Sequence, residues 1–194
     1  MKRFIAATPL AIVALIVAGA ATQDQDQAKH ESGHDEIIGA VAVLIPSDGS
    51  EVRGLVVFLK EEDGIRVQGQ IIGLSPGKHG FHVHEFGDLR SPDGTAAGDH
   101  FNPTDGKHAG READERHVGD LGNIEADEQG IATFDFLDEK LSFEGKTSIL
   151  GRGLVVHADA DDLKSQPSGD AGGRVAVGVI GVANPAPLEE VEQE

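Results

Sequence analysis

The feature of this sequence that most restricts its fold is a series of short apolar runs, β-branched or alternating, between clusters of turn residues. Clusters such as PSDGS, EEDG and LSPGK separate the first of these runs. Runs of this length bounded by Gly, Pro, Asp and Ser are typical of β-strands. They occupy residues 37–45, 52–60, 65–72, 79–86, 131–137, 149–156 and 175–182, with a shorter candidate at 119–125.

These runs predict an all-β domain over residues 37–184. No stretch keeps a helical apolar period for three or more turns. Strands at this spacing form an antiparallel sandwich or barrel with Greek-key connections. Two connections, 87–116 and 158–173, are much longer than turns, and structureless loops of that length are usually functional or disordered.

The flanking segments are predicted to lie outside this domain. Residues 1–20 have a positive start, an apolar stretch and a small-residue exit, the pattern of a secretory signal peptide; an uncleaved membrane anchor is the alternative. Residues 21–36 form a polar linker that contains His30 and His34. This segment is either a solvated tail that happens to contain histidine or a weak metal-capturing arm. Residues 185–194 form an acidic tail. The protein is therefore expected in an extracytoplasmic compartment, periplasmic or secreted.

The charge of the chain restricts its partners. Its formal net charge is −18, which argues against nucleic acid or an anionic membrane surface as a partner. The chain has no cysteine, so neither a lipid anchor on cysteine nor a disulfide can form.

Six of the nine histidines lie at strand ends or in the long loop. His82 and His84 are two apart on a predicted strand and therefore point to the same face, where they can hold a metal. His79 is three residues before His82 and faces the other way, so we interpret it as a packing or hydrogen-bonding histidine. His157 follows an apolar strand in LVVHADADD.

A second group lies in and just after the first long loop, in GDHFNP, GKHAG and ERHVGD. Three histidines and a carboxylate are donors that zinc accepts, in the number that a closed tetrahedral structural site needs. The group consists of His100, His108, His117 and Asp120.

The seven candidate ligands are one short of the eight donors that two four-coordinate metals require. The deficit disappears if His100, which lies in the sequence between the His82/His84 pair and the later loop ligands, binds one metal through each ring nitrogen. One site would then be His82, His84, His100 and His157, and the other His100, His108, His117 and Asp120. The all-imidazole site favours copper and the mixed site suits zinc. The alternative interpretation is that these seven polar residues are unrelated and form no common metal site.

The segments GFHVHEFGD, HFNP, ERHVGDLGN, GRGLVVHADADDL and GGRVAVGVIGVA resemble those of the copper–zinc superoxide dismutase family, over about residues 38–183. The resemblance implies an eight-stranded antiparallel Greek-key β-barrel, often a homodimer, and disproportionation of superoxide to dioxygen and hydrogen peroxide. It assigns the same copper and zinc ligands, with His100 as the shared imidazolate. It also implies that Asp161 hydrogen-bonds one ligand of each metal and that Arg174 draws superoxide to the copper.

The sequence departs from that family in two places. The family's usual disulfide would lie close to Gly94 and at Val177, where no cysteine is present. The loop after His157 is short, lacks the Glu-Glu-x-x-Lys steering residues of relatives, and offers only Lys164 as a cation. Weaker attraction of the substrate is therefore expected.

Two other functions use part of the same pattern. A copper-binding or copper-delivery protein without turnover would need the histidines, but neither the zinc group nor Arg174. A zinc hydrolase would need an open metal position and a general base, and the chain has no H-E-x-x-H sequence.

Overall fold

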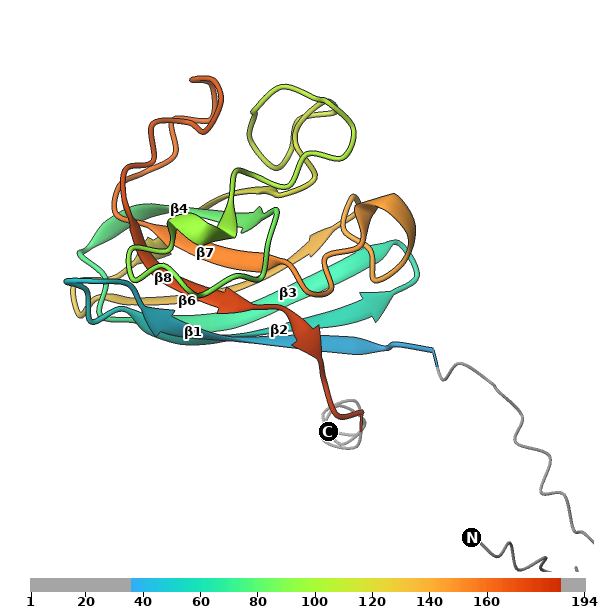
Figure 1. Cartoon of the computed structure of the whole chain (residues 1–194), viewed down its shortest axis with the longest axis horizontal. Coiled ribbons are helices and arrows are strands. Elements are labelled where there is room, and N and C mark those ends of the chain that lie inside the picture. The colour runs from blue at the N-terminus through green and yellow to red at the C-terminus, as the bar shows by residue number, and fades with distance from the viewer. Residues whose placement is uncertain (1–35, 186–194) are drawn as a thin grey trace, which may run out of the picture. The chain divides into compact units, whose positions relative to one another are not determined.

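The computed structural model describes residues 36–185, and the predicted signal peptide, most of the linker and nearly all of the acidic tail lie outside them. The described chain is built from strands, with two short 3-10 turns at Thr95–Ala97 and Gly145–Thr147 (Figure 1). The strands are β1 (Gly39–Pro46), β2 (Arg53–Glu61), β3 (Gly64–Ile72), β4 (Gly77–His84), β5 (Asp120–Ala126), β6 (Ile131–Asp138), β7 (Gly153–His157), β8 (Arg174–Val179) and β9 (Gly181–Val182). Within this range no helix has the length and apolar character needed to cross a bilayer.

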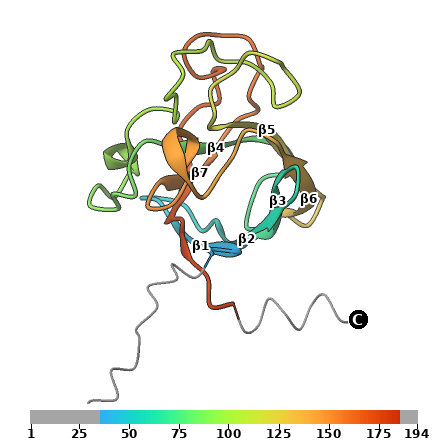
Figure 2. The same cartoon turned by 90° about the vertical axis from the view of Figure 1, so that its right-hand side faces the viewer.

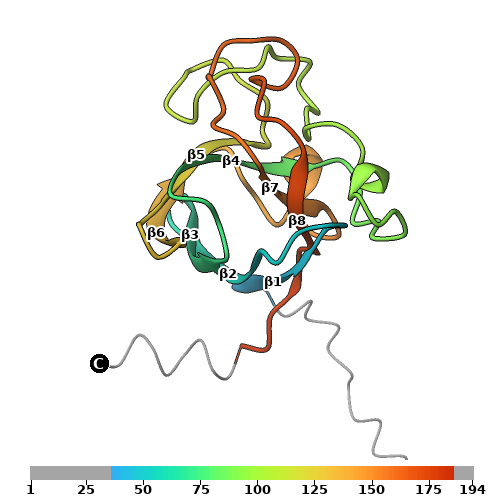
Figure 3. The same cartoon turned by 90° about the vertical axis from the view of Figure 1, so that its left-hand side faces the viewer.

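The strands form an antiparallel Greek-key barrel, which confirms the predicted fold class. Hydrogen bonding gives the order β5-β4-β7-β8-β1-β2-β3-β6, and β9 pairs with β1. The two ends of this order, β5 and β6, lie side by side and nearly close the barrel (Figures 2 and 3). The β3–β4 and β6–β7 connections join strands that are not neighbours in this order, which is the Greek-key pattern.

Alternation along the strands fills the barrel. Ala40, Ala42 and Leu44 of β1 are buried, as are Val56 and Phe58 of β2. Because successive side chains of a strand point to opposite faces, the residues between them face outward. One continuous apolar core results, and it also takes in Phe81, Val83, Leu154 and Val156.

Strand β7 and most of β4 are buried on both faces. Phe81 and Val83 point into the core, so His82 and His84 point outward, yet these histidines are 0% and 1% exposed. Two connections cover this outer face, residues 85–119 and 158–173, and they lie together on one side of the barrel (Figures 2 and 3). The barrel therefore supplies a rigid floor and the two loops a cover.

Most predicted strand ends lie within two residues of the observed ones, but two predicted strands differ more. The run 149–156 becomes a strand only from Gly153, because Gly151 adopts a positive φ of 75° and Arg152 N–H closes a turn on the Ile149 carbonyl. The last run is divided at Ile180, whose N–H donates to Arg152 and whose carbonyl accepts from Gly151. Both breaks have one cause, since the 149–152 turn packs against the end of β8.

Candidate metal centre

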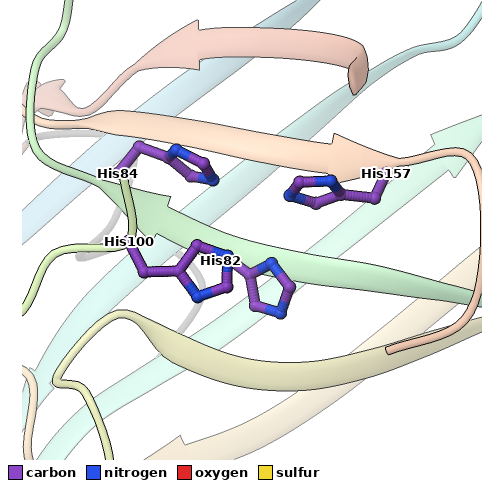
Figure 4. Close-up of side chains that lie close together, drawn as sticks. All are labelled: His82, His84, His100 and His157. Atoms are coloured by element: carbon purple, nitrogen blue, oxygen red, sulfur yellow. The ribbon is translucent and has the colours of Figure 1, made fainter. Parts of the chain in front are cut away.

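Four histidines from two strands and one loop meet on the covered face of β4. His82 and His84 come from β4 and His157 from the end of β7, while His100 reaches them from the loop (Figure 4). His84 and His100 form an isolated bridge, which fixes the loop backbone beside the strand end. One potential ligand atom from each of the four side chains lies within 4.8 Å of the others, and all four are buried. We call this group the four-histidine set.

Hydrogen bonds on one ring nitrogen leave the other nitrogen of each imidazole free. His84 Nδ1 donates to the Gly98 carbonyl at 2.9 Å, and His157 Nδ1 donates to the Gly172 carbonyl at 3.2 Å. The remaining atoms, His82 Nδ1 and the Nε2 atoms of His84, His100 and His157, are buried without a hydrogen-bond partner among the described residues. Orphaned buried polar atoms are rare in proteins, and several converging nitrogens suit a metal ion.

The second set is His100, His108, His117 and Asp120, also within 4.8 Å and buried. The Asp120 Oδ1 atom lies 2.8 Å from His100 Nδ1, 3.0 Å from His108 Nδ1 and 3.2 Å from His117 Nδ1. Its other oxygen accepts from the N–H groups of Ala109 and His117. One carboxylate oxygen thus faces three imidazole nitrogens at once. Because it combines imidazole and carboxylate donors, we call this group the mixed-donor set.

His100 belongs to both sets through different atoms. Its Nδ1 faces Asp120, whereas its Nε2 has no hydrogen-bond partner among residues 36–185. The His82 and His100 ring centroids are 4.0 Å apart, and those of His100 and His117 are 5.7 Å apart. The geometry therefore brings together all seven residues that the sequence singled out, with His100 in the middle.

Asp161 joins the two sets from behind. Its side chain is fully buried, and it accepts hydrogen bonds from His82 Nε2 at 2.8 Å and His108 Nε2 at 2.9 Å. Both histidines are thereby oriented with Nδ1 toward their own set. Burial raises the pKa of Asp161, but the bonds from His108 and His82 outweigh it and hold the pKa below its usual range.

Burial favours the neutral form of three histidines, His82, His84 and His157. It lowers the pKa of His82 to about 4 and that of His157 to about 3, and it lowers the pKa of His84 well below its ordinary value. For His108 burial acts in the same direction, yet Asp120 and Asp161 raise its pKa to about 9. Neutral imidazole is the form that binds metals, so His82, His84 and His157 are ready to bind a metal at neutral pH.

A cavity of about 430 Å³ opens the four-histidine set to solvent. Arg174, at the start of β8, lines it, and its guanidinium donates to the carbonyls of Gly94 and Gly98 at 2.5 and 2.6 Å. The lining also includes His84, His100 and His157. Because His117 also lines the cavity, a small molecule entering it meets four imidazoles and the Arg174 cation.

The amino-acid sequence matches the Copper/zinc superoxide dismutase family over residues 52–180, which is more than half of the chain. The chain belongs to this family. Copper and zinc are the metals in the family's name. The orphaned nitrogens of the four-histidine set suit copper, and the imidazole and carboxylate groups of the mixed-donor set suit zinc.

Two individual proteins are similar to this chain. The chain is 47% identical over 119 residues to the extracellular superoxide dismutase [Cu-Zn] of Drosophila melanogaster, a match that covers 58% of this chain. That match spans 65% of the relative's own length. The crystal structure of the clock protein EA4 is similar at a TM-score of 0.69 and 43% identity, covering 75% of this chain and 95% of that one.

An ion pair that was not recognised from the sequence supports His117. Arg116 and Asp138 are both almost fully buried and pair at 2.6 Å. The Arg116 guanidinium also donates to the carbonyls of His117 and Val118 at 3.0 Å. This pair fastens the His117 backbone to the end of β6. An arginine next to a candidate ligand was the available signal, but its partner is 22 residues away and could not be paired from sequence.

Two amides were missed in the same way. Gln166 both donates to and accepts from the His108 backbone, at 2.8 and 2.9 Å. Asn123 forms a similar double contact with the Asp161 backbone, at 2.9 and 2.8 Å. Each amide links one covering loop to another part of the site, so the two loops and β5 form one connected network.

Three other sequence predictions concern His79, Lys164 and the positions of the absent disulfide. His79 is buried and bonds to the carbonyls of His157 and Ser75, so it is a hydrogen-bonding residue as predicted. Lys164 is exposed and does not line the cavity. A Cβ on Gly94 would lie 3.0 Å from Val177 Cγ2, so the two positions named for the absent disulfide are in contact.

Proposed function

We propose that the protein disproportionates superoxide to dioxygen and hydrogen peroxide, with copper in the four-histidine set and zinc in the mixed-donor set. The observation that supports this best is the position of His100, whose two ring nitrogens face different sets. A shared imidazolate supplies the eighth donor that two four-coordinate metals need. Bound copper would supply reversible one-electron chemistry, and bound zinc a fixed charge that acts on the shared ring.

The chain's own residues then have distinct roles. The Arg174 charge faces the cavity that an anion must enter, and preorganised charge of this kind stabilises an anion without reorganisation. His100 Nε2 is the atom that can take up a proton and donate it to the reduced product. Asp161 keeps His82 and His108 in one tautomer and orientation, the usual role of a carboxylate behind a metal ligand.

Copper binding or delivery without turnover is the alternative. It would use the four-histidine set alone, and would require neither a closed mixed-donor set nor an arginine in the cavity. Both features are better explained by turnover of an anion. The function is tested by assaying superoxide consumption of the protein loaded with copper and zinc.

Replacing Arg174 with alanine is expected to lower the rate about tenfold, the effect of losing about 1.4 kcal/mol of anion stabilisation. Arg90→Ala is the matched control, because the Arg90 side chain is 89% exposed and pairs with Asp88 at the surface. The measurement is the rate of superoxide loss at low ionic strength with metal content determined for each variant. Equal rates for Arg174→Ala and the parent would contradict this role.

We propose an extracytoplasmic location, on the basis of the signal-peptide pattern in residues 1–20 and the extracellular relative from Drosophila melanogaster. The absence of cysteine is compatible with any redox compartment. Secretion and periplasmic export share this pattern. Cleavage can be measured by N-terminal analysis of the exported protein.

We also propose a homodimer formed through the outer face of β1 and β2. Val43 and Leu55 are cross-strand partners that are 61% and 49% exposed, and Ile45 on the same face is 46% exposed. Adjacent exposed apolar side chains of this kind mark interaction surfaces. Val43→Glu is expected to convert the dimer into a monomer in sedimentation experiments, because it would bury a charge on each copy. Glu62→Gln, in the exposed β2–β3 turn, is the control, and a parent protein that sediments as a monomer would contradict the proposal.

A further inference from the structure

The mouth of the metal cavity carries more negative than positive charge. Three carboxylate side chains line it, those of Glu85, Asp99 and Asp105, and Arg174 is the one cationic side chain among the described lining residues. An anion approaching the four-histidine set therefore passes three like charges, which oppose the attraction of Arg174 and of the metal ions that the two sets would hold. This balance was not expected from sequence, because the three carboxylates come from different parts of the 85–119 loop.

Two of these carboxylates make no structural contact with the described residues. Glu85 accepts a hydrogen bond from the Asp99 N–H at 3.1 Å and so helps to shape the loop. The side chains of Asp99 and Asp105 are exposed, and within residues 36–185 neither accepts a hydrogen bond nor forms a direct ion pair. Packing does not require a carboxylate at either position. The effect of these two side chains is therefore expected on the electrostatic potential in the cavity.

Arg174 cannot turn away from these charges. Its guanidinium is held by the Gly94 and Gly98 carbonyls, on either side of the 3-10 turn that precedes Asp99. The charge of Asp99 also acts on this guanidinium, together with that of Asp93. The attraction that Arg174 exerts on an anion is thus partly cancelled at its source.

We propose that Asp99 and Asp105 are specificity-determining residues that disfavour anions at the cavity mouth, so that superoxide is attracted to the site less strongly than Arg174 and the bound metal ions alone would attract it. The inference rests on the proposed function and concerns the approach of the substrate, not the chemistry at the metals. Neutral molecules of similar size are unaffected by the two charges. The site therefore discriminates against anions relative to neutral ligands more than Arg174 alone would allow.

The size of the effect follows from Coulomb's law. One unit charge about 8 Å from an approaching anion in a water-like dielectric changes its local concentration about twofold. Removing both carboxylates is therefore expected to raise the rate about fourfold at low ionic strength. The gain should disappear toward about 1 M salt, where the Debye length is about 3 Å.

The test uses the full chain loaded with copper and zinc, with metal content measured for every variant. Asp99→Asn, Asp105→Asn and the double variant keep the side-chain shape and remove one or two charges. Glu62→Gln is the control, because it removes the same charge in the exposed β2–β3 turn. The rate for the double variant is expected to be higher than that for the parent and to fall more steeply with ionic strength.

A second measurement does not depend on turnover. Azide, an anion, and imidazole, a neutral ligand, are titrated against the copper-loaded protein and followed by visible absorption. The double variant is expected to bind azide about fourfold more tightly while its affinity for imidazole is unchanged. If the double variant bound both azide and imidazole more tightly, the result would indicate a wider cavity and would overturn the proposal.

The outcomes separate this inference from the proposed function. A parent protein with full metal content but no superoxide consumption contradicts the proposed function, and the azide titration still decides the inference. An active parent whose Asp99→Asn and Asp105→Asn variants match it in rate, salt dependence and azide affinity overturns the inference alone.

Discussion

Replacing His100 with alanine is expected to weaken both metal sites at once. His100 Nδ1 faces Asp120 and its Nε2 is a free member of the four-histidine set, so one truncation removes a donor from each. Loss of an outer partner of a ligand already weakens metal binding by about 10–100-fold. Loss of the ligand itself should exceed that for copper and for zinc. Elemental analysis and copper EPR after dialysis against a chelator measure the two sites separately.

Two matched variants show whether the coupling belongs to His100. His84 is a member of the four-histidine set alone, and His117 of the mixed-donor set alone. His84→Ala should lose copper and keep zinc, and His117→Ala should lose zinc first. If His100→Ala kept normal zinc and an unchanged copper spectrum, the shared-ligand assignment would be wrong.

Removing the metals is expected to lower the melting temperature by roughly 10 °C. A ligand that binds only the folded state at a thousandfold excess over its dissociation constant adds about 4 kcal/mol. In a domain of this size one kcal/mol shifts the melting temperature by about 2–4 °C. Calorimetry of metal-free and reconstituted protein measures the difference, and a shift below a few degrees would contradict a major stabilising role for the metals.

Two arginine side chains restrict the part of the 85–119 loop that is expected to open when the metals are removed. Arg174 ties residues 94–98 to β8, while Arg116 ties residues 116–118 to β6. The segment between these anchors contains the exposed Lys107, beside the candidate ligand His108. Trypsin is therefore expected to cleave first after Lys107 in metal-free protein, and zinc alone should protect this bond.

Arg90 supplies an internal reference for this experiment. Its side chain is 89% exposed and lies before the first anchor, so cleavage there should not depend on metal. Equal resistance at Lys107 with and without zinc would mean that the anchors, rather than the metal, order the segment. Equal loss of protection at both positions would indicate opening of the whole loop.

Much of the fold could be predicted because the relevant signals are local. Alternation fixes which side chains of β1 and β2 face the core, and the two-residue spacing of His82 and His84 places both on one face. The clustering of the seven candidate ligands could be predicted because six of them are histidines, which number nine in the chain and have few other uses. The break at Gly151 was missed because positive φ at a glycine is set by the turn it forms, not by the apolar run around it.

Other features could not be predicted because they depend on contacts between distant segments. Arg116 finds Asp138 only after the loop has folded onto β6. The charges of Asp99 and Asp105 can act on an approaching anion only because the folded loops place both residues in the lining of the cavity that also contains Arg174. In each case the residue type was visible, but the partner lay on another part of the chain.

The contact between the loop and the last strands has a consequence for how the protein matures. Ala97 packs with Val155 and Val177 in a small apolar cluster, at the place where Gly94 also meets Val177. Packing here depends on no oxidant, isomerase or thiol pairing. Synthesis in a strongly reducing cell interior and synthesis in an oxidising one should therefore give the same folded chain, and reductants such as dithiothreitol should leave its covalent state untouched.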